Sequence, residues 1–328
     1  MAKFGAMNDD YPRNIKEFES RFNSEEACRE YLFRLRWPEG FRCPRCGAAK
    51  AWPFRSTRLA CGGCGHQTSV TAGTIFQDTR IPLVEWFRAI WWVTSQKNGA
   101  SALGLQRVLG LGSYKTAWTW LHKLRRAMVR PGRERLSGPV EVDETYIGGL
   151  EEGVHGRQTD AKALVIIACE EREKGVGRIR LRHIPDASAA SLEPFVEEAI
   201  ETGSEVHTDG WEGYSGLKAL GYKHKVTVLR RRRQSPSDLL PRVHLVAALL
   251  KRWLLGTHQG AVSREHLGYY LDEFTFRFNR RKSKSRGKLF YRLIQQAVAV
   301  EPVPYKAMVK CYEPAPGKPQ AVGVTCIK

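Results

Sequence analysis

The order of strand and helix patterns in the C-terminal half of the chain predicts an α/β fold with a mixed five-stranded sheet. Three strand-like segments come first, at 139–149, 161–171 and 178–186, and the last two are joined as in a hairpin. A helix, a strand, a second helix, a strand and further helices follow. This order suits a sheet flanked by helices, as in the ribonuclease-H-like fold. We expect this domain at 131–300, followed by a loosely ordered tail at 301–328 that is rich in Pro and Gly.

Ahead of that domain, residues 1–36 are expected to form a helical segment. The stretch 14–36 is charged and has a helical period, and Ser24 with two following glutamates opens its second helix. The N-terminus lacks the apolar core of a signal peptide, and no apolar run approaches the roughly 20 residues of a membrane helix. We therefore expect a cytoplasmic protein.

Residues 37–72 have the cysteine spacing of a zinc ribbon. Two CxxC pairs, CPRCG and CGGCG, lie about 15 residues apart, and each is followed by a glycine that permits a tight turn. Four thiolates close the tetrahedral shell of Zn²⁺, so this metal would be structural. The alternative is two unrelated redox pairs. The predicted zinc ligands are Cys43, Cys46, Cys61 and Cys64.

Residues 73–130 predict a helix-turn-helix module that binds DNA. Pro82 fits the first turn of one helix. Ser101 caps a second helix, LGLG ends it, and Ser113 caps a third helix that is rich in basic and aromatic residues. An ordinary pair of packed helices is the alternative. The predicted phosphate contacts of this module are Lys115, Arg125 and Arg126.

The charge of the chain points to a polyanionic partner. Its 328 residues include 53 lysines and arginines against 34 acidic residues, a formal charge of +19. Such a surplus lies on the surface and attracts nucleic acid, although a charge that serves solubility alone is the alternative. Further predicted DNA contacts are Arg230, Arg231, Arg232, Arg233, Arg252, Arg280 and Arg281.

Two aspartates stand where the predicted fold would bring them together. Asp143 interrupts an apolar strand, and Asp209 ends a strand just before a glycine turn. In a ribonuclease-H-like sheet the first and fourth strands are neighbours, and two adjacent carboxylates repel unless a cation lies between them. Mg²⁺ or Mn²⁺ is the expected cation, and two such ions about 4 Å apart would support in-line phosphoryl displacement. The alternatives are a surface-facing strand residue and an ordinary turn aspartate.

The sequence resembles the DDE-class insertion-sequence transposases that join a zinc ribbon to an ISXO-like catalytic domain. The resemblance extends from about 18 to 300 and rests on CPRCG, CGGCG, TAGTIFQDTRIPLVEW, VEVDETYIGG, HTDGWEGY, LLKRWLLGTHQGAVS and YLDEFTFRFNRR. It implies that Asp143 and Asp209 are the first two catalytic acids, and that the protein cleaves and joins the ends of a mobile element in double-stranded DNA. It further implies a prokaryotic protein that is found on the nucleoid when bound to DNA. Paired cuts at two element ends would require at least a homodimer.

The stretch EFTFRFNRR is a signature of this family. It places Glu273, Arg277 and Arg280 on one predicted helix. From spacing alone, the first two would form an intrahelical ion pair worth only about 0.3–0.5 kcal/mol. We expect both roles, with Arg280 and Arg281 nearer the DNA.

The third catalytic position departs from the family. Related enzymes place Glu or Asn on the helix that begins near 241, and a lysine further along it. A glutamate seven residues before Lys251 would align with His244, whereas an asparagine two residues before it would align with Leu249, which cannot bind a metal. Histidine can bind one, and it suits Mn²⁺ better than Mg²⁺. We predict His244 as the third metal ligand and Lys251 as a phosphate contact; a capping or core histidine is the alternative.

These features favour a DNA transposase over two other functions. The rival is a catalytically inactive, transposase-derived protein that binds a specific DNA sequence. Strand transfer that depends on Asp143 would exclude this rival. A zinc-ribbon nuclease acting on RNA is less favoured, because no base-stacking RNA motif is present.

Overall fold

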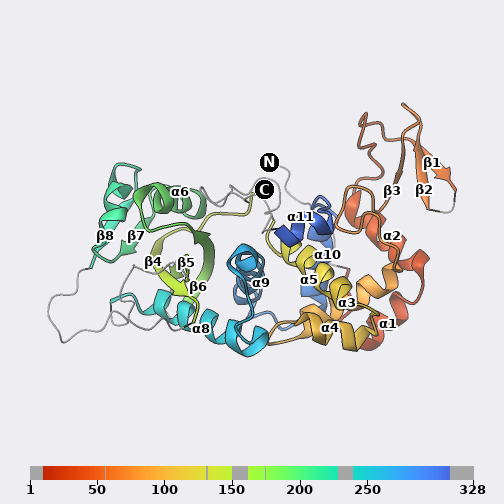
Figure 1. The fold of residues 1–328 in the computed structure, drawn as a ribbon. Helices are drawn as coiled ribbons and strands as arrows, with labels where there is room; N and C mark the ends of the chain where they lie inside the picture. The colour runs from red at the N-terminus through yellow and green to blue at the C-terminus, as the bar shows by residue number, and fades with distance from the viewer. Residues whose placement is uncertain are drawn as a thin grey trace. The chain divides into compact units, whose positions relative to one another are not determined.

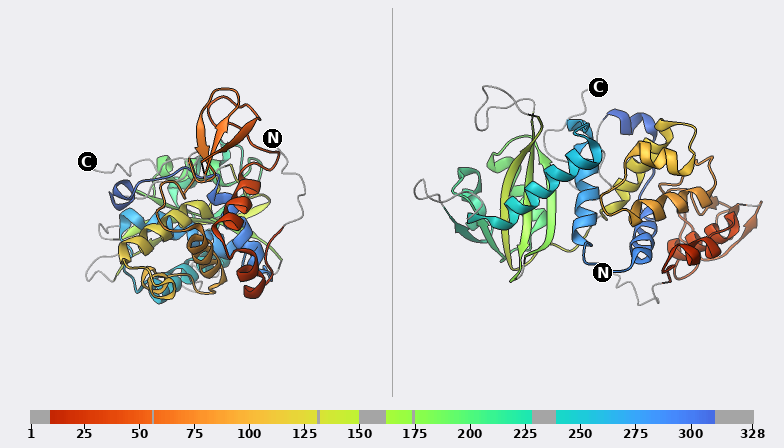
Figure 2. Two further views of the ribbon diagram at one scale, coloured as in Figure 1. Left: turned by 90° about the vertical axis from the view of Figure 1, so that its right-hand side faces the viewer. Right: turned by 90° about the horizontal axis from the view of Figure 1, so that it is seen from below.

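The computed structural model describes residues 10–55, 57–130, 132–149, 162–173, 175–227 and 239–310 (Figures 1 and 2). Within it the chain divides into two compact units, each described here by itself. The first unit comprises Met1–Arg130 and Lys282–Met308, and the second comprises Pro131–Arg281 and Val309–Lys328. None of the helices in the described part of the chain combines the length and apolar character needed to cross a membrane.

The N-terminal segment of the first unit is helical, as predicted. Helix α1 spans Ile15–Arg21 and helix α2 spans Glu25–Arg36. The Ser24 hydroxyl accepts a hydrogen bond from the Ala27 amide at 3.2 Å, so the predicted cap at the start of α2 is present.

The core of the first unit is built from aromatic rings on helices that are far apart in sequence. Helix α3 spans Leu83–Ser95 and packs against α10, Arg286–Ala297. The Phe290 ring of α10 lies 5.4 Å from Phe18 and 5.8 Å from Phe87, centroid to centroid. The predicted boundary of the sheet domain at residue 300 is therefore wrong, because the apolar face of α10 is buried in the first unit.

The predicted loose tail also begins with ordered structure. Helix α11 spans Tyr305–Lys310, and Met308 on it is fully buried. The remainder, 311–328, lies outside the described residues.

The zinc ribbon is a three-stranded antiparallel sheet. Strands β1, β2 and β3 span Ala51–Phe54, Arg58–Cys61 and Gln67–Ser69, and β2 lies in the middle. A small apolar cluster around Trp37 and Phe41 packs against Leu59 of β2 and two of the ribbon cysteines, Cys43 and Cys61.

The predicted helix-turn-helix is also present. Helix α4 spans Ala102–Leu109, with the Ser101 hydroxyl accepting from the Gly104 amide at 3.0 Å. Gly110 ends the helix at φ +61°, a left-handed conformation that favours glycine. Helix α5 then spans Tyr114–Met128.

The second unit confirms the predicted ribonuclease-H-like sheet. Its strand order is β6-β5-β4-β7-β8. The first three strands in sequence pair antiparallel, whereas β7 pairs parallel with both β4 and β8. The strands span Pro139–Ile147 (β4), Ala163–Glu171 (β5), Val176–Ile184 (β6), Glu205–Thr208 (β7) and Lys223–Val226 (β8).

Helices cover both faces of this sheet. One face packs into an apolar core with α6, Ala189–Ala199, and the 3₁₀ helix η1, Glu212–Lys218. Helix α8, Pro241–His258, crosses β4 and β5 on the other face, as the right panel of Figure 2 shows. Successive residues of β4 alternate between the two faces. Val140 and Val142 join the apolar core, whereas Glu141 and Asp143 point toward α8.

Helix α9, Leu267–Asn279, packs on strand β6 and closes its outer edge. The Asn279 side chain accepts from the Ile179 amide at 2.7 Å and donates to the Ile179 carbonyl at 3.1 Å, like a paired strand. Arg281 donates to the carbonyls of Val176 and Gly177. Within α9, Glu273 is fully buried and pairs with Arg277 at 2.7 Å. These signature residues therefore hold the sheet edge.

Candidate zinc centre and active site

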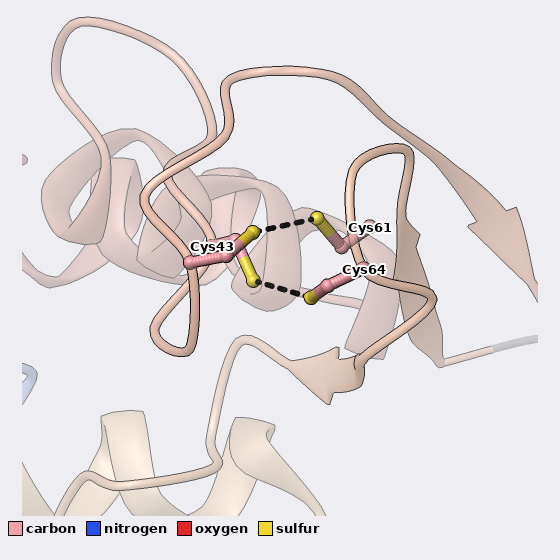
Figure 3. Close-up of side chains that lie close together, drawn as sticks. Cys43, Cys61 and Cys64 are labelled. Atoms are coloured by element: carbon pink, nitrogen blue, oxygen red, sulfur yellow. Dashed lines mark hydrogen bonds between the residues drawn. The ribbon is translucent and has the colours of Figure 1, made fainter.

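The four ribbon cysteines converge on one point. One ligand atom from each lies within 4.8 Å of the other three, and within the described residues no other group of three or more His, Cys, Asp or Glu does so. The Sγ atoms of Cys43 and Cys64 are 3.8 Å apart, and those of Cys46 and Cys61 are 3.5 Å apart. Figure 3 shows thiols from the two turns pointing toward one another.

This arrangement fits a tetrahedral zinc ion. Bonds of about 2.3 Å to a tetrahedral ion place sulfur atoms about 3.8 Å apart. Gly47 and Gly65, each directly after a CxxC pair, have φ of +75° and +69°, and their amides donate to the carbonyls of Cys43 and Cys61. The glycines thus permit the turns that aim the thiols inward, as predicted.

The first predicted acid, Asp143, lies midway along β4 with its side chain 16% exposed. Its Oδ1 accepts from the Glu144 amide at 2.8 Å, and its Oδ2 lies 3.6 Å from Nε2 of His244. The structure therefore brings together Asp143 and the residue predicted to be the third ligand, which are about a hundred positions apart in sequence.

The second predicted acid, Asp209, directly follows β7. Strand β7 pairs parallel with β4, which carries Asp143. Asp209, just after the end of β7, therefore lies next to β4. Its Oδ1 accepts from the Trp211 amide at 3.0 Å, which fixes the turn. Burial lowers the pKa of His244, and the negative charge of Asp209 is among the charges that oppose this lowering. The two aspartates and His244 do not converge as tightly as the cysteines.

His244 lies in the first turns of α8 with its side chain 31% exposed, so it is not a core residue. Burial lowers the pKa of its imidazole, an effect that Glu141 opposes and Lys251 reinforces. A lowered pKa favours the neutral imidazole, which is the form that binds a metal.

The other acids near Asp143 are engaged elsewhere. Glu141 accepts hydrogen bonds from the start of α8. Glu171 pairs with Arg242 at 2.9 Å. Glu144 points to the opposite face, where it accepts from the Tyr214 hydroxyl at 2.8 Å. Each of these three glutamates is therefore bound to groups other than Asp143 and His244.

Two of these residues were not predicted from the sequence. Tyr214 is fully buried, and burial raises its pKa well above the ordinary value, as do Glu144 and the two aspartates. Glu141 is also fully buried. The available signal was the pattern VEVDE, in which Glu141 shares with Asp143 the face of the strand opposite Val140 and Val142.

Lys251 lies seven residues after His244 and is exposed, whereas Leu249 is half-buried. Burial lowers the pKa of Lys251, and so does the positive charge of Lys162. Lys162 packs beside Gly148, where an added Cβ would lie 2.9 Å from its Cγ. Two lysines therefore gather near the end of β4.

The predicted DNA contacts of the helix-turn-helix are only partly exposed. Lys115 is exposed, with its Nζ 4.0 Å from the centroid of the Tyr305 ring. Arg125 and Arg126 are 2% and 4% exposed. They donate to backbone carbonyls at 3.4 and 3.0 Å. The prediction for these two arginines needs correction, since both guanidinium groups serve the core of the first unit.

The remaining predicted contacts differ in their surroundings. Arg252 is exposed on α8. Arg280 is half-buried over the Phe276 ring at 4.2 Å, and Arg281 is bound to the edge of β6. The run 230–233 lies outside the described residues.

Comparison with known proteins agrees with this arrangement. Residues 135–279 match the model of the ISXO2-like transposase domain, and residues 23–67 match that of the transposase zinc-ribbon domain. An uncharacterized protein in transposable element ISH50 of Halobacterium salinarum is 27% identical over 282 residues, which cover 78% of this chain and 91% of that protein.

Solved structures give weaker similarities. A chain of the simian T-cell lymphotropic virus intasome, in complex with a PP2A regulatory subunit, is 12% identical at a TM-score of 0.30, covering 58% of this chain and 70% of its own. A chain of the Mos1 strand transfer complex is 14% identical at a TM-score of 0.25, covering 65% and 75%. The chain therefore carries, in order, a segment similar to the transposase zinc-ribbon domain at 23–67 and a segment similar to the ISXO2-like transposase domain at 135–279.

Proposed function

We propose that the protein is an active enzyme that cuts and joins DNA at the ends of its element by metal-dependent phosphoryl transfer. The observation that carries this proposal is the 3.6 Å approach of His244 Nε2 to Asp143 Oδ2 on a ribonuclease-H-like sheet. An imidazole beside a strand carboxylate is a donor pair that a divalent ion can share. Asp209 would be the third ligand, arriving from the neighbouring strand.

The donor set fits Mn²⁺ or Mg²⁺, with Mn²⁺ preferred because imidazole is a softer ligand than carboxylate. A bound ion would lower the pKa of an attacking water and offset charge on the phosphate. Asp143, Asp209 and His244 would orient that ion, and Lys251 would bind a neighbouring phosphate oxygen. Water, and then the freed 3′-hydroxyl, would attack phosphorus in line while the opposite P–O bond breaks.

The first unit would hold the element end. The ribbon would present a surface stabilised by its metal, and α5, on which Lys115 is exposed, would serve as the recognition helix. Two ends must be processed together, so the active form would be at least a dimer on DNA. Zinc would be structural in this assembly, because four thiolates leave it no open position.

One observation favours the rival function, a DNA-binding protein that has lost catalysis. Leu249 occupies one of the two positions where related enzymes carry a ligand, and its side chain cannot bind metal.

An in vitro strand-transfer assay on a cloned element end, with the metal varied, separates the two functions. We expect joined products in Mn²⁺, fewer in Mg²⁺, and none from Asp143→Asn. Sequence-specific binding without cleavage in either metal would instead identify the inactive DNA-binding protein.

A further inference from the structure

Helix α8 begins without a cap of its own. Leu240, the residue before its first turn, makes no side-chain hydrogen bond to the helix. The amides of Arg242 and Val243 nevertheless both donate to Oε2 of Glu141, each at 2.8 Å. The first turn of an α-helix leaves such N–H groups unpaired, and a side-chain oxygen normally satisfies them from the adjacent residue. Here that oxygen comes from strand β4, about a hundred residues earlier.

The Glu141 carboxylate is fully committed to this contact. It is completely buried, and its second oxygen accepts from the Arg242 guanidinium at 2.8 Å. Arg242 also pairs with Glu171 of β5 at 2.9 Å, so it ties the start of α8 to two strands. A buried carboxylate is costly unless it is paired and hydrogen-bonded, and its negative charge suits the positive end of a helix. Together these bonds fix the start of α8 against β4 and β5.

The same anchor determines where His244 lies. Glu141 and Asp143 are two positions apart and therefore point to the same face of β4. Val243, which Glu141 binds, immediately precedes His244, which lies over Asp143. A shift of the first turn of α8 would move the imidazole away from the aspartate.

We propose that Glu141 is a positioning residue that pins the first turn of α8 to β4 and so holds His244 in place to share a metal ion with Asp143. The contact between Glu141 and the first turn of α8 does not depend on any activity. Its role in placing His244 for metal binding rests on the function proposed above.

The test compares two matched variants of the zinc-loaded, full-length chain. Glu141→Gln keeps the shape of the side chain but places an amide N–H₂ against donors. Glu170→Gln is the control, because Glu170 is also buried in the sheet, accepts from a backbone amide at 2.9 Å and pairs with Arg178 at 2.5 Å. Its closest partner, Arg178, lies on β6, and its only other ion pair in the described residues, with Arg172, is longer at 4.0 Å.

Hydrogen exchange tests the anchor. We expect peptides covering 241–247 to exchange at least tenfold faster in Glu141→Gln than in the wild type, and to be unchanged in Glu170→Gln. Equal protection in wild type and Glu141→Gln would overturn the anchor, and with it the proposal.

Titration with Mn²⁺ alone, monitored by electron paramagnetic resonance, tests whether Glu141 places His244 for metal binding. We expect Glu141→Gln to bind Mn²⁺ about tenfold more weakly than wild type, as for the loss of an outer-shell partner. Adding this change to His244→Ala should have no further effect, because the group it positions is gone. An additive effect, or equal losses in Glu141→Gln and Glu170→Gln, would mean a general loss of stability and would sink the proposal. Neither measurement uses DNA, so a chain that performs no strand transfer would contradict only the proposed function.

Discussion

His244 is the residue on which the interpretation of the active site depends most. It lies on α8, 3.6 Å from Asp143, with the nearby glutamates bound to other groups. The neutral imidazole would supply the one ligand that a carboxylate supplies in related enzymes.

Two substitutions at this position test that role. His244→Ala should reduce strand transfer by more than the roughly 10–100-fold that loss of an outer-shell partner costs, while DNA binding is retained. His244→Glu should restore transfer and shift the metal preference from Mn²⁺ toward Mg²⁺, since carboxylate is the harder ligand.

The control is Leu249→Asn, which installs the ligand of the other alignment. If this variant gains activity in Mg²⁺ while His244→Ala keeps near-normal transfer, the third ligand belongs at 249 and the assignment of His244 is wrong.

Cysteine reactivity makes a second prediction at this scale. Burial raises the pKa of Cys28 to about 12, with Glu25 adding to the effect, and burial also raises that of Cys169. The thiolate is the reactive form, so at pH 8 the Cys28 thiol stays protonated and reacts slowly.

Removal of zinc by a chelator should therefore expose the four ribbon thiols to alkylation while Cys28 and Cys169 stay unlabelled. Peptide mapping by mass spectrometry measures this residue by residue. Labelling of the ribbon cysteines before chelation would show that no metal protects them.

At the scale of single elements, the stretch EFTFRFNRR at the end of α9 stabilises the fold. Strand β6 is the outer strand of the sheet, and an unpaired strand edge invites association with other chains. Asn279 and Arg281 occupy part of that edge, and the Glu273–Arg277 pair is buried beneath them.

Replacing Asn279 with Ala should loosen this edge. The lost hydrogen bonds leave the Ile179 amide unpaired, at a cost of about 1–3 kcal/mol, whereas the Ile179 carbonyl keeps its bond from the Arg180 guanidinium at 2.9 Å. Amide exchange across β6 should accelerate while exchange across β7 is unchanged. Protection of β6 equal to that of the wild type would show that the side chain is dispensable there.

Sequence patterns predicted these elements well wherever the determinant is local. The alternation of apolar and polar residues predicted the strands, and Ser24 and Ser101 predicted where two helices begin. The CxxC spacing predicted the ribbon. The anchor of α8 was not predictable, since its cap comes from Glu141 on a distant strand. The burial of Arg125 and Arg126 was not predicted. A basic residue on a helix of a DNA-binding motif resembles a phosphate contact in sequence, and the backbone carbonyls that bind these two arginines come from other parts of the chain.

At the scale of the whole molecule, the formal charge of +19 should dominate DNA binding. If about six to eight phosphates are neutralised, affinity should fall roughly a thousandfold or more between 50 and 200 mM salt. Fluorescence anisotropy over a salt series measures this slope, and a flat response would mean that the positive surface is not the docking face.

One pair of variants locates part of that surface. Lys115→Ala should reduce the salt slope by about one, as expected for one lost phosphate contact. Arg88→Ala removes the same charge from the same unit, but Arg88 is paired with Glu85 at 2.6 Å and should leave the slope unchanged. Equal slopes for the two variants would remove Lys115 from the interface.

The split composition of the first unit has a consequence for how the protein is made. Its aromatic core includes Phe290, which follows the segment Pro131–Arg281 of the second unit in the chain. A nascent polypeptide on the ribosome therefore carries the ribbon and the helix-turn-helix long before it carries the helix that completes their core. The core of the domain expected to grip the element end is therefore complete only after Pro131–Arg281 have been synthesised, and a product that stops within that range lacks α10.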